Sequence, residues 1–145
     1  TRLASGAIGT SGGELFVWDL QRKERSHSFA GHASAVTALA WDASSRYLIS
    51  GSRQGNLRWW DIERGENLWV RETHKGAIQS IKRSPDGMKL ASCGDDGAIM
   101  LWDMSSGEHL ETLRRDRPYE RLNISGIKGL TEAQKEMLYA LGAID

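Results

Sequence analysis

Residues 31–72 of the chain read GHASAVTALAWDASSRYLISGSRQGNLRWWDIERGENLWVRE, and residues 73–114 read THKGAIQSIKRSPDGMKLASCGDDGAIMLWDMSSGEHLETLR. Laid over each other without a gap, the two segments are identical at ten of their 42 positions. The shared positions are His32/His74, Ala35/Ala77, Leu48/Leu90, Ser50/Ser92, Gly55/Gly97, Trp60/Trp102, Asp61/Asp103, Gly65/Gly107, Glu66/Glu108 and Leu68/Leu110. This agreement indicates an internal repeat, and a period of this size is typical of stacked structural units.

The dipeptide Trp-Asp marks the same period in three places. It occurs at residues 18–19, 60–61 and 102–103, always 42 residues apart. Gly31-His32 opens the middle unit, and Thr73-His74 holds the same place in the last unit. The first unit is partial, and its residues 3–6 align with residues 48–51 only if three residues are inserted within residues 7–14.

With Gly-His near one end and Trp-Asp near the other, a repeat of this length resembles the WD-repeat β-propeller family, whose repeats form four-stranded blades. The resemblance covers residues 3 to about 114 and implies an all-β fold: about two full blades and a partial one. We expect a partial blade at residues 1–30, WD repeats at 31–72 and 73–114, and a C-terminal tail at 115–145. Members of this family mostly bind other proteins, so the resemblance implies a protein-binding or sensing platform and not an enzyme.

Period-2 patterns and turn residues predict four strands in each full repeat. The expected strands are 36–41, 47–52, 57–61 and 67–71 in the middle repeat, and 77–83, 89–94, 98–103 and 109–114 in the last. In the tail, Thr131 followed three residues later by Gln134 is typical of a capping box. A helix is therefore expected near residues 132–141, with Gly142 as its stop.

The resemblance also implies a cluster of histidine, serine or threonine, aspartate and tryptophan in each repeat, which joins loops at one end of a blade to its strands. The last repeat offers the complete set His74, Ser92, Asp96 and Trp102. The middle repeat offers His32, Ser50, Gln54 and Trp60, and the first unit has Gly12 in place of the carboxylate. Because an amide carries no charge and is the weaker acceptor, we expect the last blade to be the best tied.

Serine, histidine and aspartate in one set also suggest a hydrolase. No strand-turn-helix elbow surrounds Ser92, and its neighbours recur with the period of the fold, which favours a structural role. Residues 95–97 lack the ligand spacing and terminal glutamate of a calcium loop. The glycines at 6, 9, 12 and 13 lack the Gly-Lys-Ser/Thr of a phosphate loop and favour a flexible turn between strands. We therefore expect no catalytic residue, metal or cofactor.

Candidate partner contacts follow from the resemblance, which places binding on the loops before the inner strand and after the second strand. The residues at those loops include Arg53, Gln54, Lys75 and Asp95, with the inserted stretch Ile8 to Gly12. Two departures from the repeat are further candidates. Arg83 aligns with Trp41 and either faces the central channel, pairs with an acid or contacts a partner. Trp69 aligns with Glu111 and either packs against a neighbouring blade or forms part of an interface.

Bulk composition limits the partners. Lys plus Arg and Asp plus Glu both number 19, and the only dense basic patch, at residues 114, 115 and 117, fits a solvated turn better than a nucleic-acid site. There is no apolar run of about 18 residues, so no membrane partner is expected. Cys93 is the single cysteine and favours a reducing compartment, hence the cytoplasm.

Two full blades and a partial one cannot close a ring, because propellers typically have four to eight blades. We expect this chain to be the C-terminal part of a larger protein, with the remaining blades in the same parent chain or in another copy. A covering partner is the third possibility. The tail from Tyr119 onward resembles tails of some bacterial multi-repeat WD proteins. That likeness implies an alternative function, in which the propeller holds an attached signal-transduction ATPase or another effector inactive.

Overall fold

The computed structural model describes residues 1–10, 12–114, 123–125, 128–141 and 143–144. The chain divides into two compact units, Thr1–Leu113 and Arg114–Asp145. Ser11 of the inserted stretch, two arginines of the expected basic patch (115 and 117) and the expected helix stop at 142 lie outside the described residues.

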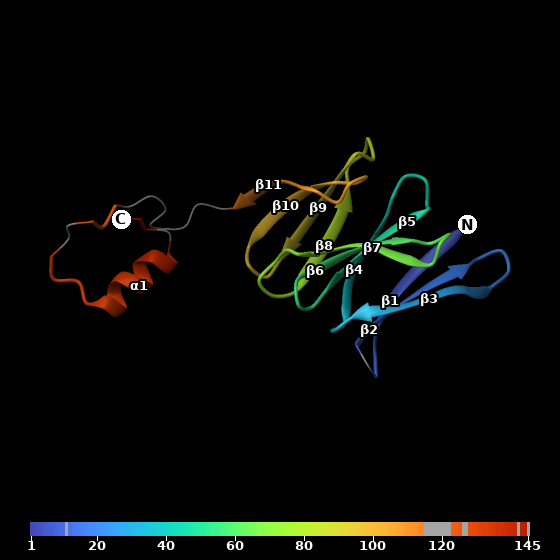
Figure 1. Cartoon of the computed structure of the whole chain (residues 1–145), viewed down its shortest axis with the longest axis horizontal. Coiled ribbons are helices and arrows are strands. Elements are labelled where there is room, and N and C mark those ends of the chain that lie inside the picture. The colour runs from blue at the N-terminus through green and yellow to red at the C-terminus, as the bar shows by residue number, and fades with distance from the viewer. Residues whose placement is uncertain (11, 115–122, 126–127, 142, 145) are drawn as a thin grey trace. The chain divides into compact units, whose positions relative to one another are not determined.

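The first unit consists of three antiparallel sheets, which we call blades 1 to 3 (Figure 1). Blade 1 contains β1 (Arg2–Gly9), β2 (Gly12–Asp19) and β3 (Glu24–His32), in that order across the sheet. Blade 2 contains β4 (Val36–Trp41), β5 (Tyr47–Ser52), β6 (Asn56–Asp61) and β7 (Glu66–Glu72). Blade 3 contains β8 (Ile78–Arg83), β9 (Lys89–Gly94), β10 (Ala98–Asp103) and β11 (His109–Arg114). The strands predicted for blades 2 and 3 are confirmed to within one residue, as is the all-β, part-propeller fold.

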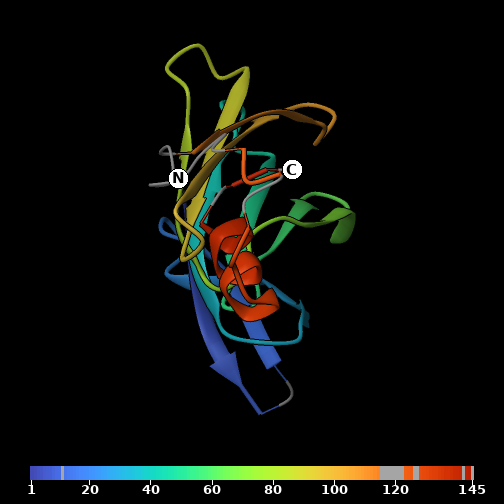
Figure 2. The same cartoon turned by 90° about the vertical axis from the view of Figure 1, so that its left-hand side faces the viewer.

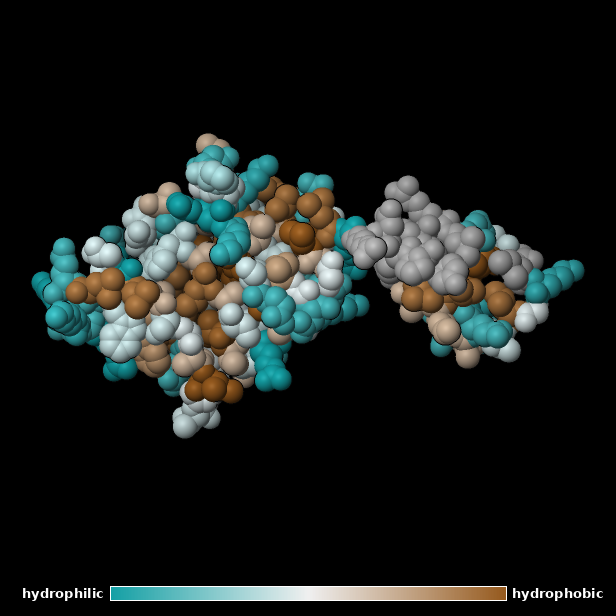
Figure 3. Space-filling view, turned by 180° about the vertical axis from the view of Figure 1, so that it is seen from behind, coloured by the Kyte–Doolittle hydropathy of each residue, from teal (hydrophilic) through white to brown (hydrophobic). Residues whose placement is uncertain are grey.

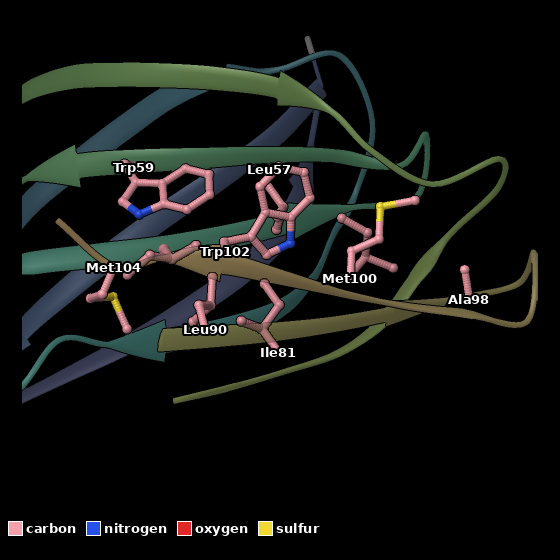
Figure 4. Packing of buried hydrophobic residues seen from close by; sticks show 10 residues of the cluster. Leu57, Trp59, Ile81, Leu90, Ala98, Met100, Trp102 and Met104 are labelled. Atoms are coloured by element: carbon pink, nitrogen blue, oxygen red, sulfur yellow. The ribbon is translucent and has the colours of Figure 1, made fainter. Parts of the chain in front are cut away.

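Blade 2 is buried on both faces, because its side chains alternate between the two faces of the sheet and each face packs against another blade. One face packs Leu48, Trp60 and Ile62 against blade 1. The other packs Ile49, Leu57 and Trp59 against blade 3. Figure 4 shows this second interface, where Trp59 of β6 lies near Trp102 of β10 with ring centroids 6.3 Å apart in an edge-to-face arrangement. Such tryptophan pairs add specific geometry to a large burial of apolar area.

The outer blades leave their other faces open. Ile99 holds in blade 3 the place that Leu57 holds in blade 2, yet Ile99 is 44% exposed whereas Leu57 is fully buried. In blade 1, Leu3 holds the place of the buried Leu48 and is 52% exposed. Apolar side chains accordingly reach the surface of this unit in the space-filling view (Figure 3). Exposed apolar faces of this kind mark surfaces that another element covers.

The inserted stretch lengthens a hairpin. Pairing between β1 and β2 continues to Gly9 opposite Gly12, whereas the matching pairs of β5 and β6 end at Gly51 opposite Leu57. The prediction of a flexible turn over these glycines is therefore wrong for most of the stretch. Backbone pairing continues because the insertion keeps both strands extended, and Gly12 accepts a φ of 135° next to the turn. Ile8 projects from this extension and is 72% exposed.

The second unit contains a short helix, α1 (Glu132–Ala140), visible with the sheets in Figures 1 and 2. Thr131 caps the helix through the Gln134 amide, and the Gln134 side chain accepts from the Thr131 amide, as the capping-box pattern predicts. Ile124 and Ala143 of this unit are buried, and the Ala143 amide donates to the Leu138 carbonyl of the helix. Within the described part of the chain, no helix has the length and apolar character needed to cross a bilayer.

Candidate functional site

A hydrogen-bonded chain of four side chains links the loop before β8 to the strands of blade 3. Trp102 Nε1 donates to Ser92 Oγ at 3.0 Å, and Ser92 Oγ lies 2.8 Å from His74 Nε2. The other ring nitrogen of His74, Nδ1, lies 2.8 Å from Asp96 Oδ1. Asp96 also accepts from the Lys75 and Ala98 amides through its two oxygens. The structure thus brings together all four residues of this set. Each buried polar side-chain atom of these four residues has a hydrogen-bond partner.

Electrostatics at Asp96 are set by two opposing effects. Burial acts to raise the pKa of Asp96, but the hydrogen bonds from His74 and from the Ala98 and Lys75 amides outweigh it and lower the pKa below its usual value. A carboxylate that accepts several hydrogen bonds stays ionised. Asp96 therefore presents a charge-assisted acceptor to His74 at neutral pH.

The corresponding set in blade 2 is incomplete. Trp60 Nε1 donates to Ser50 Oγ at 2.8 Å, and Ser50 Oγ lies 2.6 Å from His32 Nε2. His32 Nδ1 is buried and has no hydrogen-bond partner. Gln54, which holds the place of Asp96, is exposed and makes no hydrogen bond among the described residues. Gln54 was expected to be a weaker acceptor than Asp96. In the structure it is no acceptor for His32, and the buried Nδ1 is left without a partner.

A second difference between the blades lies directly beside this histidine. A Cβ atom on Gly94 of blade 3 would lie 2.7 Å from Cγ of His74, so only glycine fits there without movement. Blade 2 carries Ser52 at the same place, and its side chain accepts from the Asn56 amide.

Burial, and after it the positive charge of Arg58, lowers the pKa of His32 to about 4. His32 is therefore neutral at physiological pH.

Blade 1 retains only the strand half of the cluster. Trp18 Nε1 donates to Ser5 Oγ at 3.0 Å, as Trp60 does to Ser50 and Trp102 to Ser92. Trp18 is 37% exposed, whereas its two counterparts are buried. The Trp–Ser bond therefore recurs in all three blades.

The serines of these clusters are closed to a substrate. Ser50 and Ser92 are almost fully buried, and each hydroxyl is already shared between a histidine and a tryptophan. A nucleophilic serine must instead be exposed to the group that it attacks. Among the described residues, no group of three or more histidine, cysteine, aspartate or glutamate side chains could hold a metal ion.

Four of the six candidate partner-contact residues lie at one end of the blades, which we call the loop end. It is formed by residues 33–35, 53–55, 73–77 and 95–97, because antiparallel order returns these connections to the same side. Arg53, Gln54, Lys75 and Asp95 are all exposed there. A hollow of about 450 Å³ at this end is lined by Gln54, Asn56, Glu72, Thr73, His74 and Lys75.

Asp95 at the loop end is engaged by its own blade. Its carboxylate accepts from the Ala77 amide at 3.0 Å and from Gln79 Nε2 at 2.6 Å. The carboxylate therefore holds the entry to β8, while its exposed position still leaves it open to solvent.

The other two candidates lie elsewhere. Arg83 ends β8 at the side opposite Lys75; it is exposed and has no ion-pair partner among the described residues. Trp69 packs against Trp59 with ring centroids 6.4 Å apart, and against the backbone of Gly107 in blade 3. Trp69 is thus packed within blade 2 and against blade 3, but it is only partly buried, so its role as a partner contact stays a prediction.

Two charged residues of blade 2 were missed by sequence reasoning. Asp61 is buried and pairs with Arg46 at 2.8 Å, and the hydrogen bond from Arg46 lowers the pKa of Asp61. Arg58 is half-buried over the Trp60 ring and donates to Asn67 at 3.3 Å, while its buried Nε has no partner. The sequence held a signal for Arg58, since the aligned residue in blade 3 is the apolar Met100.

Comparison with known proteins agrees with this architecture. The family described as WD domain, G-beta repeat, matches residues 23–61 and 65–103, which together make up more than half of the chain. The chain therefore belongs to the WD-repeat family.

Individual relatives match over a shorter span. Protein FIZZY-RELATED 2 of Arabidopsis thaliana is 47% identical over 47 residues, which are 32% of this chain and 9% of that protein. U3 small nucleolar RNA-associated protein 12 of Saccharomyces cerevisiae is 44% identical over 46 residues, 32% of this chain and 5% of that protein. The chain thus spans less than a tenth of the length of either relative. These relatives are eukaryotic, so they lend no support to the expected bacterial affiliation.

Among solved structures, a chain in the crystal structure of the Mitotic Checkpoint Complex superposes with a TM-score of 0.70 at 25% identity. The superposition covers 79% of this chain and 34% of that one. The fold is therefore that of part of a WD-repeat propeller, a class of domain that generally serves as a protein-interaction scaffold.

Proposed function

We propose that this chain is the C-terminal part of a propeller in a larger protein and that its loop end binds a protein partner. The proposal rests on one combination of features. Two blade faces are open, and the loop end presents exposed polar side chains around a hollow. The open faces indicate that further blades pack against them. At the loop end, Arg53, Lys75 and Asp95 are exposed and can contact a partner.

The comparisons support a protein partner. A structural neighbour is a chain of an assembly, the Mitotic Checkpoint Complex. Restraint of an attached ATPase or other effector is a more specific version of the same role, which we propose from the likeness of the tail. A cytoplasmic location, which rests on the single cysteine, also stays a prediction.

Paired charge reversals test the proposal. Arg53→Glu with Lys75→Glu changes the loop end, whereas Arg83→Glu changes an exposed arginine at the opposite end of blade 3. Proteins cross-linked to the wild-type protein in its native extract are identified by mass spectrometry, and their capture by each variant is then measured. We expect at least about a tenfold loss for the loop-end variant and little change for Arg83→Glu. Equal capture by the wild-type protein and the loop-end variant would refute binding at this end.

A further inference from the structure

In blade 3, two adjacent carboxylates satisfy three donors of the loop that leads into β8. Asp96 accepts from His74 Nδ1 at 2.8 Å and from the Lys75 amide at 3.1 Å. Asp95 accepts from the Ala77 amide at 3.0 Å. This geometry shows how a carboxylate fits the loop end of a blade in this protein.

Blade 2 has the same donors without the carboxylates. The counterparts of the three donors are His32 Nδ1 and the amides of Ala33 and Ala35, and none of them donates to another described residue. Ser34 Oγ in the same loop is also buried without a partner. The turn that carries two aspartates in blade 3 carries Arg53 and Gln54 here. A cation and an amide therefore replace two negative charges next to three open donors.

The hydrogen-bond network assigns the open nitrogen of His32 as a donor. Ser50 has one hydroxyl proton and accepts from Trp60 Nε1. Among the described residues, the only other hydrogen-bond partner of that hydroxyl is His32 Nε2, at 2.6 Å, so Ser50 donates to Nε2. In the neutral ring the proton then lies on Nδ1. His32 is only 3% exposed, and a buried N–H without an acceptor is costly.

We propose that the loop end of blade 2 is a carboxylate-binding site. The carboxylate takes the place that Asp96 takes in blade 3, accepts from His32 Nδ1 and the Ala33 and Ala35 amides, and lies beside the positive charge of Arg53. Gln54 is exposed and makes no hydrogen bond among the described residues, so its side chain moves aside for the ligand.

Two sources share this chemistry: an acidic side chain of a protein partner and a free small acid. The site itself stands on the geometry of His32 and its loop, whereas the assignment to a partner rests on the proposed function. Arg53 belongs to both arguments, because it lies at the loop end and next to the open donors.

Acetate is a suitable probe, with chloride at equal ionic strength as the control salt. By mass action, we expect acetate to raise the thermal unfolding midpoint of the wild-type protein by about 2–4 °C more than chloride does. The matched variant, Ser52→Gly with Gln54→Asp, copies the residues of blade 3 and supplies its own carboxylate. It should be more stable than the wild type and show no specific response to acetate, and Gln54→Asp alone, an exposed turn substitution, should show a reduced response.

An equal response to acetate in the wild-type protein and the double variant, or no difference between acetate and chloride in the wild type, would overturn the site. Competition then shows which molecule supplies the carboxylate. If acetate weakens the partner capture described above, the natural ligand is an acidic side chain of that partner. Acetate that stabilises the protein without weakening capture assigns it to a free acid, and the carboxylate site stands even if the proposed partner surface fails.

Discussion

Nδ1 of His74 donates to Oδ1 of Asp96 across 2.8 Å, and this bond fastens the loop that enters blade 3 to the turn between β9 and β10. The same nitrogen of His32 in blade 2 has no partner, although Ser50 and Trp60 repeat the rest of the arrangement. One repeat of 42 residues thus produces a complete polar cluster in one blade and an open one in the next.

Asp96→Ala should lower the free energy of unfolding by about 1–3 kcal/mol, because it leaves His74 Nδ1 and the Lys75 amide without an acceptor. Gln54→Ala should change it by less than about 0.5 kcal/mol, since Gln54 makes no comparable bond. Urea unfolding of the two variants in the closed-ring protein, under one set of conditions, measures both values. Equal losses would show that the two clusters do not differ as described.

Protein stability should decline on acidification from pH 6.5 to pH 4. Burial and the charge of Arg58 hold the folded-state pKa of His32 at about 4, below the ordinary value of 6.5. A lowered histidine pKa means that the unfolded chain binds more protons in this window, so the contribution is complete above pH 6.5 and is lost as pH falls towards 4. The loss attributable to His32 should be about 2 kcal/mol.

Chemical denaturation at several pH values measures this dependence, and His32→Gln is the matched control because it cannot titrate. The difference between the two proteins should shrink as pH falls from 6.5 to 4. A difference that stays constant over this range would mean that His32 titrates normally in the folded protein.

Arg58→Met should be neutral or stabilise the protein by about 0.5–1 kcal/mol. The substitution installs the residue that blade 3 has at this place, Met100, and removes a half-buried cation whose Nε has no partner. Thermal and urea unfolding give the change. A loss above about 1 kcal/mol would instead show that the contacts of Arg58 with Trp60 and Asn67 outweigh its desolvation.

Ile99→Lys should reduce self-association of the chain, because it places a charge on the open face of blade 3. Met88→Lys is the control, since Met88 is 69% exposed in a turn and does not lie on that face. Sedimentation velocity at one protein concentration compares the two variants with the wild type. Identical distributions for all three would argue against the open face as the surface of association.

Much of the fold could be predicted from the sequence, because each blade repeats one pattern of apolar residues and turns. The strands of blades 2 and 3 followed from that pattern to within one residue. The extended hairpin of β1 and β2 could not be predicted, because the inserted glycines are compatible with either a loop or continued strand pairing. The backbone hydrogen bonding in the structure distinguishes the two. The polar cluster of blade 3 also followed from aligned residues.

The candidate site was harder to predict, because it depends on where side chains lie relative to each other. Gln54 suggested a weaker acceptor for His32, whereas the structure shows none. The lack of room for a side chain beside the His74 ring, at the place where blade 2 has Ser52, could be seen only from the position of that ring. Trp69 is similar: an aromatic residue on an outer strand fits an interface with a partner or with a neighbouring blade, and only the structure shows that it lies against Gly107 of blade 3.

The molar mass of the chain in solution, measured by light scattering, tests most directly whether these blades are part of a larger ring. Because blades 1 and 3 expose apolar faces that blade 2 buries, we expect the isolated chain to self-associate into a defined oligomer or to aggregate. A folded monomer of 16.1 kDa that unfolds cooperatively would contradict this, because it would show that the open faces need no cover.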